Sequence, residues 1–437
     1  MYPYQGIKTV SFEEAVKVVK SGDRIHIHSV ACAPQGLIQA LCNRGRAGEL
    51  RDVKLQHLHT EGSAPYAEAE FEGIFFLESY FVGSNVRKPT QEGYADYVPV
   101  HLSETQKLIR SGIHPVDVAM IQVCPPDKHG FVSMGTSVDA TLAAVQNAKT
   151  VIAVINPNVP RAWGDAIIRL SDIDIFCEDN TPLIEAHPAT LTEQDIAIGK
   201  NVASLIEDGA TLQMGIGAIP NAVLSQLGNH KNLGIHTEMF ADGVLPLYEK
   251  GVVNNMNKKF DKGKIVSTFL MGSKRVYDFI DDNPGVAMMD VGYTNDPFII
   301  AQQPKMTAIN SALSVDITGQ VNADSLGIKF YSGSGGQLDF IRGAAASEGG
   351  KPIIALPAVT NKGVSKICPT LLNGAGVVTT RFDVHYIVTE FGIADLYGKT
   401  LQERAKTLIN IAHPDHRETL DKAAFERFGS HYHFISK

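Results

Sequence analysis

The chain has 437 residues, of which 44% are hydrophobic and 20% are charged. This composition is typical of a folded protein with two or three domains and excludes disordered and fibrous classes. The formal net charge is -8 and neither Lys nor Arg forms a block, so the basic patch that nucleic-acid binding requires is missing and a small-molecule ligand is favoured.

The cysteines and the N-terminus indicate a protein of the reducing cytoplasm. The five cysteines are scattered and include no C-x-x-C pair. The first ten residues, MYPYQGIKTV, lack a basic stretch followed by an apolar one, and no apolar run approaches the roughly 18 to 20 residues that span a bilayer. We therefore expect neither export nor insertion into a membrane.

The first half opens with a helix and a strand-loop-helix unit. Ser11 and Glu14 have the spacing of a capping box. Residues 21–41 then give a glycine, an alternating strand pattern, a small-residue loop, a proline and an apolar helix pattern. Proline in the first turn is a common start signal, so a helix is predicted after Pro34.

Two H-x-H pairs raise the possibility of a zinc site. His26 and His28 share one strand face, and His57 and His59 share another. No cysteine or carboxylate pattern accompanies them, and histidines on strands are more often packed or line a polar cleft. We predict no metal.

The pattern of residues 21–41 returns in the second half of the chain. Three segments have partners at offsets of about 186 to 200 residues, and they occur in the same order in both halves. One similar segment could be chance, whereas three in order indicate an internal repeat. The pairs are 21–41 with 208–227, 126–133 with 315–322, and 136–155 with 336–356.

The repeat predicts the division of the chain and its fold class. A second capping box, Thr192 with Asp195, follows a proline-containing stretch, so the predicted domains are 1–188 and 189–437. Strands such as 150–155 and 351–356 are continuous apolar runs between helices, which is typical of sheets covered on both faces. We predict two similar α/β domains related by the repeat, with the active site between them.

Two glycine-rich loops of the second half could bind a ligand through backbone N–H groups. One is MGIGAIP at 214–220 and the other lies within 331–344, and each precedes a predicted helix. A phosphate or an oxyanion would suit such loops, and a purely structural turn or connector is the alternative. The first loop is not a dinucleotide fingerprint, because Pro220 takes the place of the third glycine.

A carboxylate at the end of a predicted strand is the strongest catalytic candidate. Glu238 follows the apolar stretch Leu233 to His236 and precedes Met239 and Phe240, so it lies near apolar surface that disfavours its charged form. Glu61 also follows a His-Thr pair. We favour Glu238 because both glycine-rich loops belong to its half.

Three other polar residues adjoin apolar segments of the second half. Glu390 follows a strand pattern and precedes a loop, and Asn310 and Lys366 stand singly. Each can equally be a residue that satisfies local hydrogen bonds.

Four ordered motifs resemble a known family. MGIGAIPNAVL, GIHTEMFADGV, YSGSGGQLDFIRGA and VTEFGIADLYGKT are similar to motifs of the acetyl-CoA hydrolase/transferase family of CoA-transferases, over nearly the whole chain. The resemblance is greatest to 4-hydroxybutyrate CoA-transferases and implies two CoA-transferase-like α/β domains with Glu238 as the nucleophile. It further implies an oxyanion and thioester site at Gln213, Gly215, Ile216, Gly217, Gly335 and Gly336, with Asn310, Lys366 and Glu390 as supporting groups.

The resemblance also implies a reaction. CoA would pass from a short-chain acyl-CoA to a short carboxylate, with 4-hydroxybutyrate as the expected acid, by a ping-pong mechanism through a glutamyl-CoA thioester. Coenzyme A is then a substrate, no metal or tightly bound cofactor is needed, and a homodimer or higher homo-oligomer is expected. Alternatives are an acyl-CoA hydrolase with the same nucleophile and a butyryl-CoA:acetate CoA-transferase. A non-catalytic nucleotide or sugar-phosphate binding protein is less compatible, since Glu238 would repel phosphate.

Overall fold

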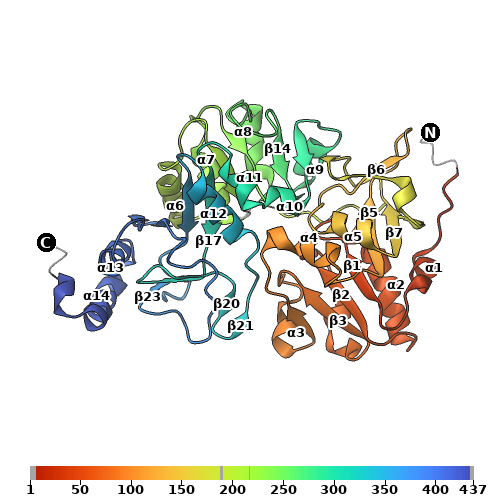
Figure 1. Cartoon of the computed structure of the whole chain (residues 1–437), viewed down its shortest axis with the longest axis horizontal. Coiled ribbons are helices and arrows are strands. Elements are labelled where there is room, and N and C mark those ends of the chain that lie inside the picture. Colours follow the sequence, from red (N-terminus) through yellow and green to blue (C-terminus); the bar gives the residue numbers. More distant parts are fainter. Residues whose placement is uncertain (1–5, 188–189, 216, 434–437) are drawn as a thin grey trace. The chain divides into compact units, whose positions relative to one another are not determined.

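The computed structural model describes residues 6–187, 190–215 and 217–433, and the chain divides into two compact units (Figure 1). Unit 1 contains the chain up to His187 together with 264–294 and 330–335; unit 2 contains 188–263, 295–329 and the chain from Gly336 onward. The predicted domains, 1–188 and 189–437, are contiguous, so the two later segments of unit 1 fall within the predicted second domain.

Unit 1 is built on a seven-stranded parallel sheet with the order β10-β7-β5-β1-β2-β3-β4. All six residues of β5 are buried, as expected for a strand covered on both faces. The strands are β1 (Arg24–Ile27), β2 (Val53–His57), β3 (Phe75–Ser79), β4 (Ala95–Tyr97), β5 (Val118–Val123), β7 (Thr150–Ile155) and β10 (Ile175–Glu178). Smaller strands of this unit are β6 (Phe131–Ser133), β8 (Trp163–Gly164), β9 (Ile167–Arg169), β14 (Ile265–Ser267), β15 (Phe269–Leu270) and β16 (Val286–Met288).

The helices of unit 1 start where the sequence predicts. Ser11 caps the first helix, and α2 begins directly after Pro34 with Leu37, Ile38 and Leu41 buried on one face. The helices are α1 (Phe12–Ala15), α2 (Gln35–Arg46), α3 (Arg87–Glu92), α4 (Leu102–Arg110), α5 (Thr141–Asn147), α9 (Lys274–Ile280) and α10 (Val291–Thr294).

Unit 2 contains a six-stranded sheet with the order β12-β11-β17-β22-β24-β25, parallel except for the last pair. Its strands are β11 (Thr211–Met214), β12 (Gly234–Ile235), β17 (Thr307–Ser311), β22 (Lys351–Ala355), β24 (Tyr386–Thr389) and β25 (Gly392–Asp395). The order β24-β22-β17-β11-β12 matches β10-β7-β5-β1-β2 of unit 1 strand for strand. The two similar α/β folds predicted from the repeat are therefore confirmed.

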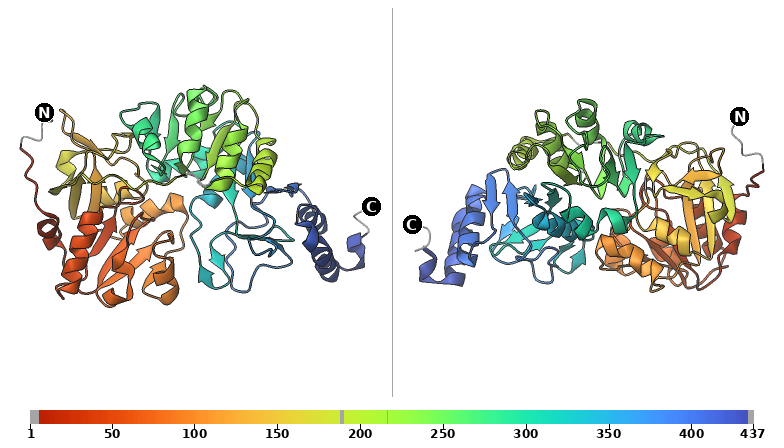
Figure 2. Two further views of the ribbon diagram at one scale, coloured as in Figure 1. Left: turned by 180° about the vertical axis from the view of Figure 1, so that it is seen from behind. Right: turned by 45° about the horizontal axis from the view of Figure 1, so that its top comes forward.

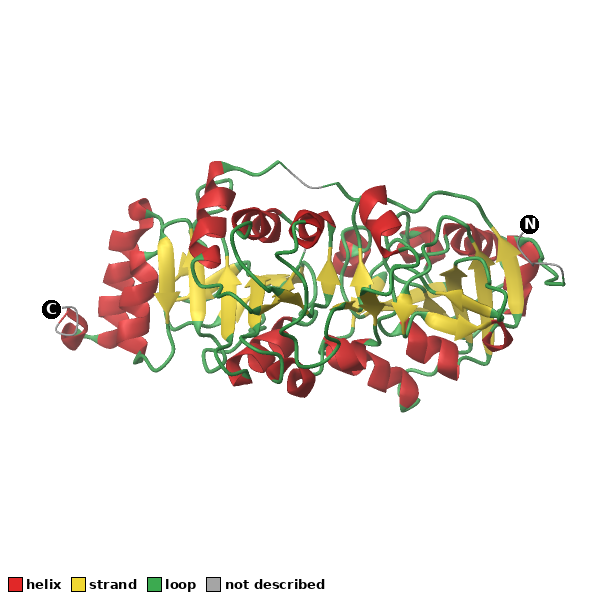
Figure 3. Ribbon diagram, turned by 90° about the horizontal axis from the view of Figure 1, so that it is seen from above, coloured by secondary structure: helices red, strands yellow, loops and turns green. Residues whose placement is uncertain are grey.

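Helices lie on both sides of the strands in each part of the chain (Figure 3). Thr192 and Asp195 form the predicted capping box of α6, and α13 and α14 lie side by side (Figure 2). The helices of unit 2 are α6 (Glu193–Ala203), α7 (Ala218–Gln226), α8 (Leu245–Glu249), α11 (Pro297–Ala301), α12 (Gln337–Ala346), α13 (Leu401–Asn410) and α14 (Pro414–Phe428). Smaller strands are β13 (Met239–Phe240), β18 (Ser314–Asp316), β19 (Val321–Asn322), β20 (Ser325–Leu326) and β23 (Ile367–Cys368).

Within the described residues, none of the helices combines the length and the apolar composition that crossing a membrane requires.

Candidate active site

Glu238 follows β12, at the carboxyl ends of the parallel strands of unit 2. The strand is shorter than expected, because it contains Gly234 and Ile235 only. The hydroxyl of Thr237 lies 2.8 Å from the carbonyl oxygen of Met214, the last residue of β11, and also accepts the Met214 N–H at 3.2 Å. This double contact fixes the chain immediately before Glu238.

Two donors of unit 2 contact the Glu238 carboxylate. The side-chain amide of Asn295 donates to Glu238 Oε2 at 2.9 Å, and the backbone N–H of Gly336 donates to the same carboxylate. A Cβ atom built on Gly336 would lie only 2.1 Å from Glu238 Oε2, so the absence of a side chain permits this approach.

The surroundings of Glu238 change its acidity strongly. Burial raises the pKa of its carboxyl to about 7, and the negative charge of Asp339 acts in the same direction. The hydrogen bonds from Asn295 and from the Gly336 backbone act the other way, because they stabilise the ionised form. Met239 and Phe240, the next residues, are buried. The carboxylate is therefore poorly solvated yet held in a defined orientation.

The first glycine-rich loop lies between β11 and α7. Gly217 adopts φ +112° at the start of α7, a conformation that favours glycine, while nothing lies within 4 Å of a Cβ built on Gly215. Ile216, the third residue predicted here, lies outside the described residues. Gln213, on β11, accepts a hydrogen bond from the Asn310 amide at 3.0 Å, so the structure brings these two predicted residues together.

The second glycine-rich loop is divided between the two units, which the sequence did not indicate. Gly335 belongs to unit 1, where its carbonyl accepts the Leu102 N–H at 3.2 Å, and it adopts φ +52°. Gly336 belongs to unit 2 and contacts Glu238. Residues 331–335, in the second half of the sequence, thus belong to unit 1, whereas Gly336 belongs to the unit of Glu238.

Lys366 and Glu390 lie close to one another in unit 2. Both carboxylate oxygens of Glu390 have donors, one from the Gln194 side chain at 2.6 Å and one from the Ala358 N–H at 2.9 Å. Burial lowers the pKa of Lys366, and the charge of Glu390 opposes this effect. The charge of Glu390 therefore acts on the Lys366 amine.

The predicted histidine pairs of unit 1 are packed side chains. His26 contacts the Thr141 hydroxyl at 3.0 Å and His57 contacts the Tyr66 hydroxyl at 2.9 Å. Burial lowers the pKa of His26 to about 4 and that of His57 to about 3. Among the described residues, no group of three or more His, Cys, Asp or Glu side chains is placed to hold a metal ion.

Glu61, the other glutamate that follows a His-Thr pair, lies in unit 1. Its carboxylate is 3.8 Å from the ring of His59, and burial raises its pKa. Within the described part of the chain, no side-chain amide donates to the Glu61 carboxylate as Asn295 does to Glu238.

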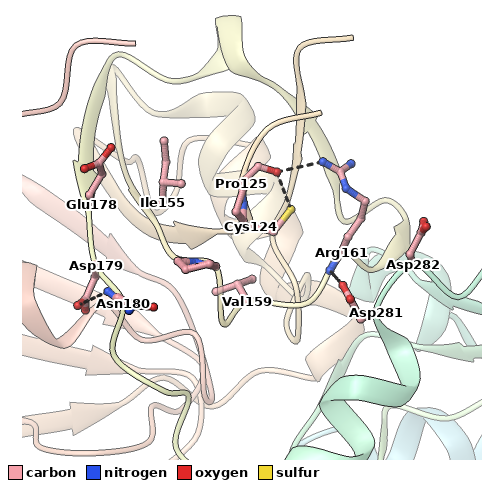
Figure 4. Close-up of a pocket in the computed structure, with 11 residues that line it drawn as sticks. Cys124, Pro125, Ile155, Val159, Arg161, Glu178, Asp179, Asn180, Asp281 and Asp282 are labelled. Carbon is pink, nitrogen blue, oxygen red and sulfur yellow. Dashed lines mark hydrogen bonds between the residues drawn. The ribbon is translucent and has the colours of Figure 1, made fainter. Parts of the chain in front are cut away.

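A cavity of about 910 Å³ in unit 1 has the wrong charge for CoA (Figure 4). It lies at the carboxyl ends of β5, β7 and β10, and its lining combines Arg161 with four carboxylates. Arg161 donates its backbone N–H to Asp281 and its guanidinium to the Pro125 carbonyl, as Figure 4 shows. An acidic wall repels phosphate groups. The acidic lining residues are Glu178, Asp179, Asp281 and Asp282.

Three residues around Glu238 were not predicted from the sequence: Asn295, Thr237 and Asp339. Asn295 belongs to an Asn-Asp-Pro stretch, in which Asp296 caps α11, so the pattern indicates a turn but not a contact with a glutamate 57 positions away. Thr237 adjoins the catalytic candidate and could have been examined for a hydrogen bond to a neighbouring strand.

Comparison with known proteins identifies the family. The model of the acetyl-CoA hydrolase/transferase N-terminal domain matches residues 3–185, and that of the C-terminal domain matches residues 272–424. The chain belongs to the acetyl-CoA hydrolase/transferase family.

Relatives within this family agree on the type of reaction. A succinyl-CoA:acetate/propanoyl-CoA:succinate CoA transferase of Fasciola hepatica is 52% identical, over 95% of this chain and 87% of its own. A 4-hydroxybutyrate coenzyme A transferase of Clostridium kluyveri is 47% identical, over 96% of this chain and 98% of its own. The crystal structure of RipA from Yersinia pestis has a TM-score of 0.92 at 36% identity and covers 96% of this chain and 98% of that one. Because relatives that are 40–52% identical over most of the chain are CoA transferases, the chain described here is a CoA-transferase.

Proposed function

We propose that this CoA-transferase moves CoA from a short-chain acyl-CoA, acetyl-CoA or butyryl-CoA, to a short carboxylate such as 4-hydroxybutyrate, with Glu238 as the covalent nucleophile. The observation that carries the proposal is the Glu238 carboxylate itself, which is oriented by Asn295 and Gly336 while burial keeps its pKa near 7. A carboxylate in water is a weak nucleophile, and partial desolvation makes it more reactive.

The proposed reaction has four steps and needs no proton transfer. A Glu238 oxygen attacks the thioester carbonyl and the C–S bond breaks, which gives an acyl-glutamyl anhydride and CoA thiolate. The thiolate attacks the glutamyl carbonyl and releases the first acid, leaving a glutamyl-CoA thioester. The incoming carboxylate attacks this thioester, expels the thiolate and forms a second anhydride. The thiolate then attacks the new acyl group and frees Glu238.

The glycine-rich loop at the start of α7 and the Gly336 amide are proposed to stabilise the oxyanions of these steps. Free backbone N–H groups at a helix start are suited to developing negative charge, and preorganised donors are usually a large part of such catalysis. The proposed donors are the backbone groups of Gly215, Ile216, Gly217 and Gly336, with Gln213 and Asn310 as polar neighbours.

The charge arrangement favours an acid with an uncharged far end. The charge of Glu390 already acts on Lys366, the cation among the proposed supporting residues, so Glu390 would compete with a second substrate carboxylate for this cation. The two relatives named above differ in their acids, one being named for succinyl-CoA and the other for 4-hydroxybutyrate. We therefore expect 4-hydroxybutyrate and butyrate to be better acceptors than succinate.

The test combines covalent trapping with an acceptor panel. Incubation with acetyl-CoA followed by borohydride should reduce a glutamyl thioester to an alcohol, which peptide mass spectrometry would locate at Glu238. Acetate, propanoate, butyrate, succinate and 4-hydroxybutyrate are then compared as acceptors. Full transferase activity of Glu238→Gln would exclude the nucleophile, and CoA release that is unaffected by any acceptor would favour a hydrolase.

A further inference from the structure

A lysine is completely buried beside the strand that leads to Glu238. Lys258 lies in the segment after α8 and its relative exposure is 0%. Its aliphatic stem covers Gly234: a Cβ built on that glycine would lie 2.8 Å from Lys258 Cγ. Its ammonium nitrogen donates to the carbonyl oxygen of Ile235 at 2.9 Å. The lysine and the glycine are therefore matched to one another in shape.

The contact lies on the outer edge of the unit 2 sheet, two residues after the bridge between Leu233 and Val253. On its inner side β12 pairs with β11, and the N–H of His236 reaches the Leu212 carbonyl at 3.1 Å. On its outer side, two side chains take the place of a neighbouring strand. Asn255 Oδ1 accepts a hydrogen bond from the Ile235 N–H at 2.8 Å, and the Lys258 amine donates one to the Ile235 carbonyl oxygen. Both backbone groups of the edge residue are thus satisfied without a further strand.

Burying the amine of Lys258 costs free energy. Burial lowers the pKa of Lys258 to about 7, against the opposing charge of Asp261. Replacing buried charged groups with apolar ones of similar volume is often neutral or stabilising, so stability alone does not explain a lysine here. The amine carries N–H donors in both its charged and its neutral form, so the bond to Ile235 does not depend on protonation.

We infer that Lys258 is a positioning residue for Glu238. Its hydrogen bond to the Ile235 carbonyl holds the outer edge of β12, the strand that leads to Glu238. The inference rests on the nucleophilic role proposed above. From Ile235 the chain passes through His236, which is buried, to Thr237, whose hydroxyl is bound to Met214 on the inner side. The residue before Glu238 is thus fixed from β11, and the strand leading to it is fixed from the opposite side by Lys258.

The inference is tested with Lys258→Met, which keeps the length of the side chain and removes the donor. Lys259→Met is the matched control, because Lys259 is exposed and its amine contacts the Gln302 side chain instead. In Lys258→Met, hydrogen–deuterium exchange of peptides covering residues 233–237 should be faster than in the wild type and in Lys259→Met. The rate of borohydride-trapped thioester formation at saturating acetyl-CoA should fall by about 10²-fold with KM little changed, since misplacement of a reacting group by about 1 Å costs this much.

The outcomes separate positioning from stability and from the proposed function. Faster exchange with a wild-type trapping rate would overturn the inference, and so would unchanged exchange. Circular dichroism verifies that Lys258→Met folds, and Lys258→Leu, which also lacks a donor, provides the same readouts if Lys258→Met does not fold. Failure of the proposed function would appear separately, as full activity of Glu238→Gln in the same assay.

Discussion

The Asn295 side-chain nitrogen lies 2.9 Å from Glu238 Oε2, and 57 positions of sequence separate the two residues. This hydrogen bond lowers the pKa of Glu238 against the larger effect of burial, which raises it to about 7. Attack on a thioester requires the ionised carboxylate, so the proposed reaction should gain rate as the pH rises through this range.

Replacing Asn295 with alanine should therefore move the activity profile to higher pH. Without its donor, the ionised form of Glu238 is less stable, so a smaller fraction is ionised at neutral pH. We expect kcat/KM at pH 7 to fall by about tenfold, the value of a typical hydrogen bond to a charged group. The measurement is kcat/KM against pH, with the exposed Asn229→Ala as control. An unchanged profile would exclude the pKa effect of Asn295.

Asp339→Asn should have the opposite effect. The negative charge of Asp339 raises the pKa of Glu238, so its removal should lower that pKa and shift the ascending limb of the profile to lower pH. Activity below neutrality should then exceed that of the wild type several-fold, of the order expected for removing one nearby charge. The same kinetic series serves as the measurement, with the largely exposed Asp415→Asn for comparison. A shift to higher pH would contradict the assignment.

Gly336→Ala should displace the carboxylate by steric contact alone. Gly336 has φ −94°, which alanine adopts readily, but the new Cβ would lie 2.1 Å from Glu238 Oε2 and 2.2 Å from Asn295 Nδ2. We expect kcat to fall by about 10²-fold. The control is Gly228→Ala, where nothing lies within 4 Å of the added Cβ. If both variants retained wild-type kcat, the close approach of Gly336 would have no catalytic importance.

The sequence predicted the features of the fold that depend on local pattern. Pro34 marked the start of α2, and the offset between halves predicted the matching strand orders of the two sheets. These predictions succeeded because a helix start and an apolar strand are encoded by residues that are neighbours in the chain. The location of Glu238 at a strand end followed from the same kind of signal.

The contacts that define the site could not be predicted in this way. Asn295, Gly336 and Lys258 approach the Glu238 strand from three segments distant in sequence, and only the tertiary fold brings them together. Lys258 stands beside Lys259 in a charged stretch, which usually indicates a solvated surface. The division of residues 331–336 between two units depends likewise on long-range packing, which periodicity does not encode.

The raised pKa of Glu238 also predicts how stability depends on pH. Between the usual glutamate pKa of 4.5 and the folded value of about 7, the folded chain binds a proton that the unfolded chain has lost, so stability falls as the pH rises through this window. Glu238→Gln cannot ionise. Its free energy of unfolding should therefore increase relative to the wild type by about 3 kcal/mol between pH 4 and pH 8, with no further change above.

This comparison isolates Glu238 from the other shifted groups. The buried His26 and His57, whose lowered pKa values make stability rise with pH up to their usual value, are present in both proteins and cancel in the difference. Urea unfolding at a series of pH values measures the effect, with the exposed Glu426→Gln as control. A difference that stays flat from pH 4 to pH 8 would show that the carboxyl is not held near a pKa of 7, and the pH profiles expected for Asn295→Ala and Asp339→Asn would lose their basis.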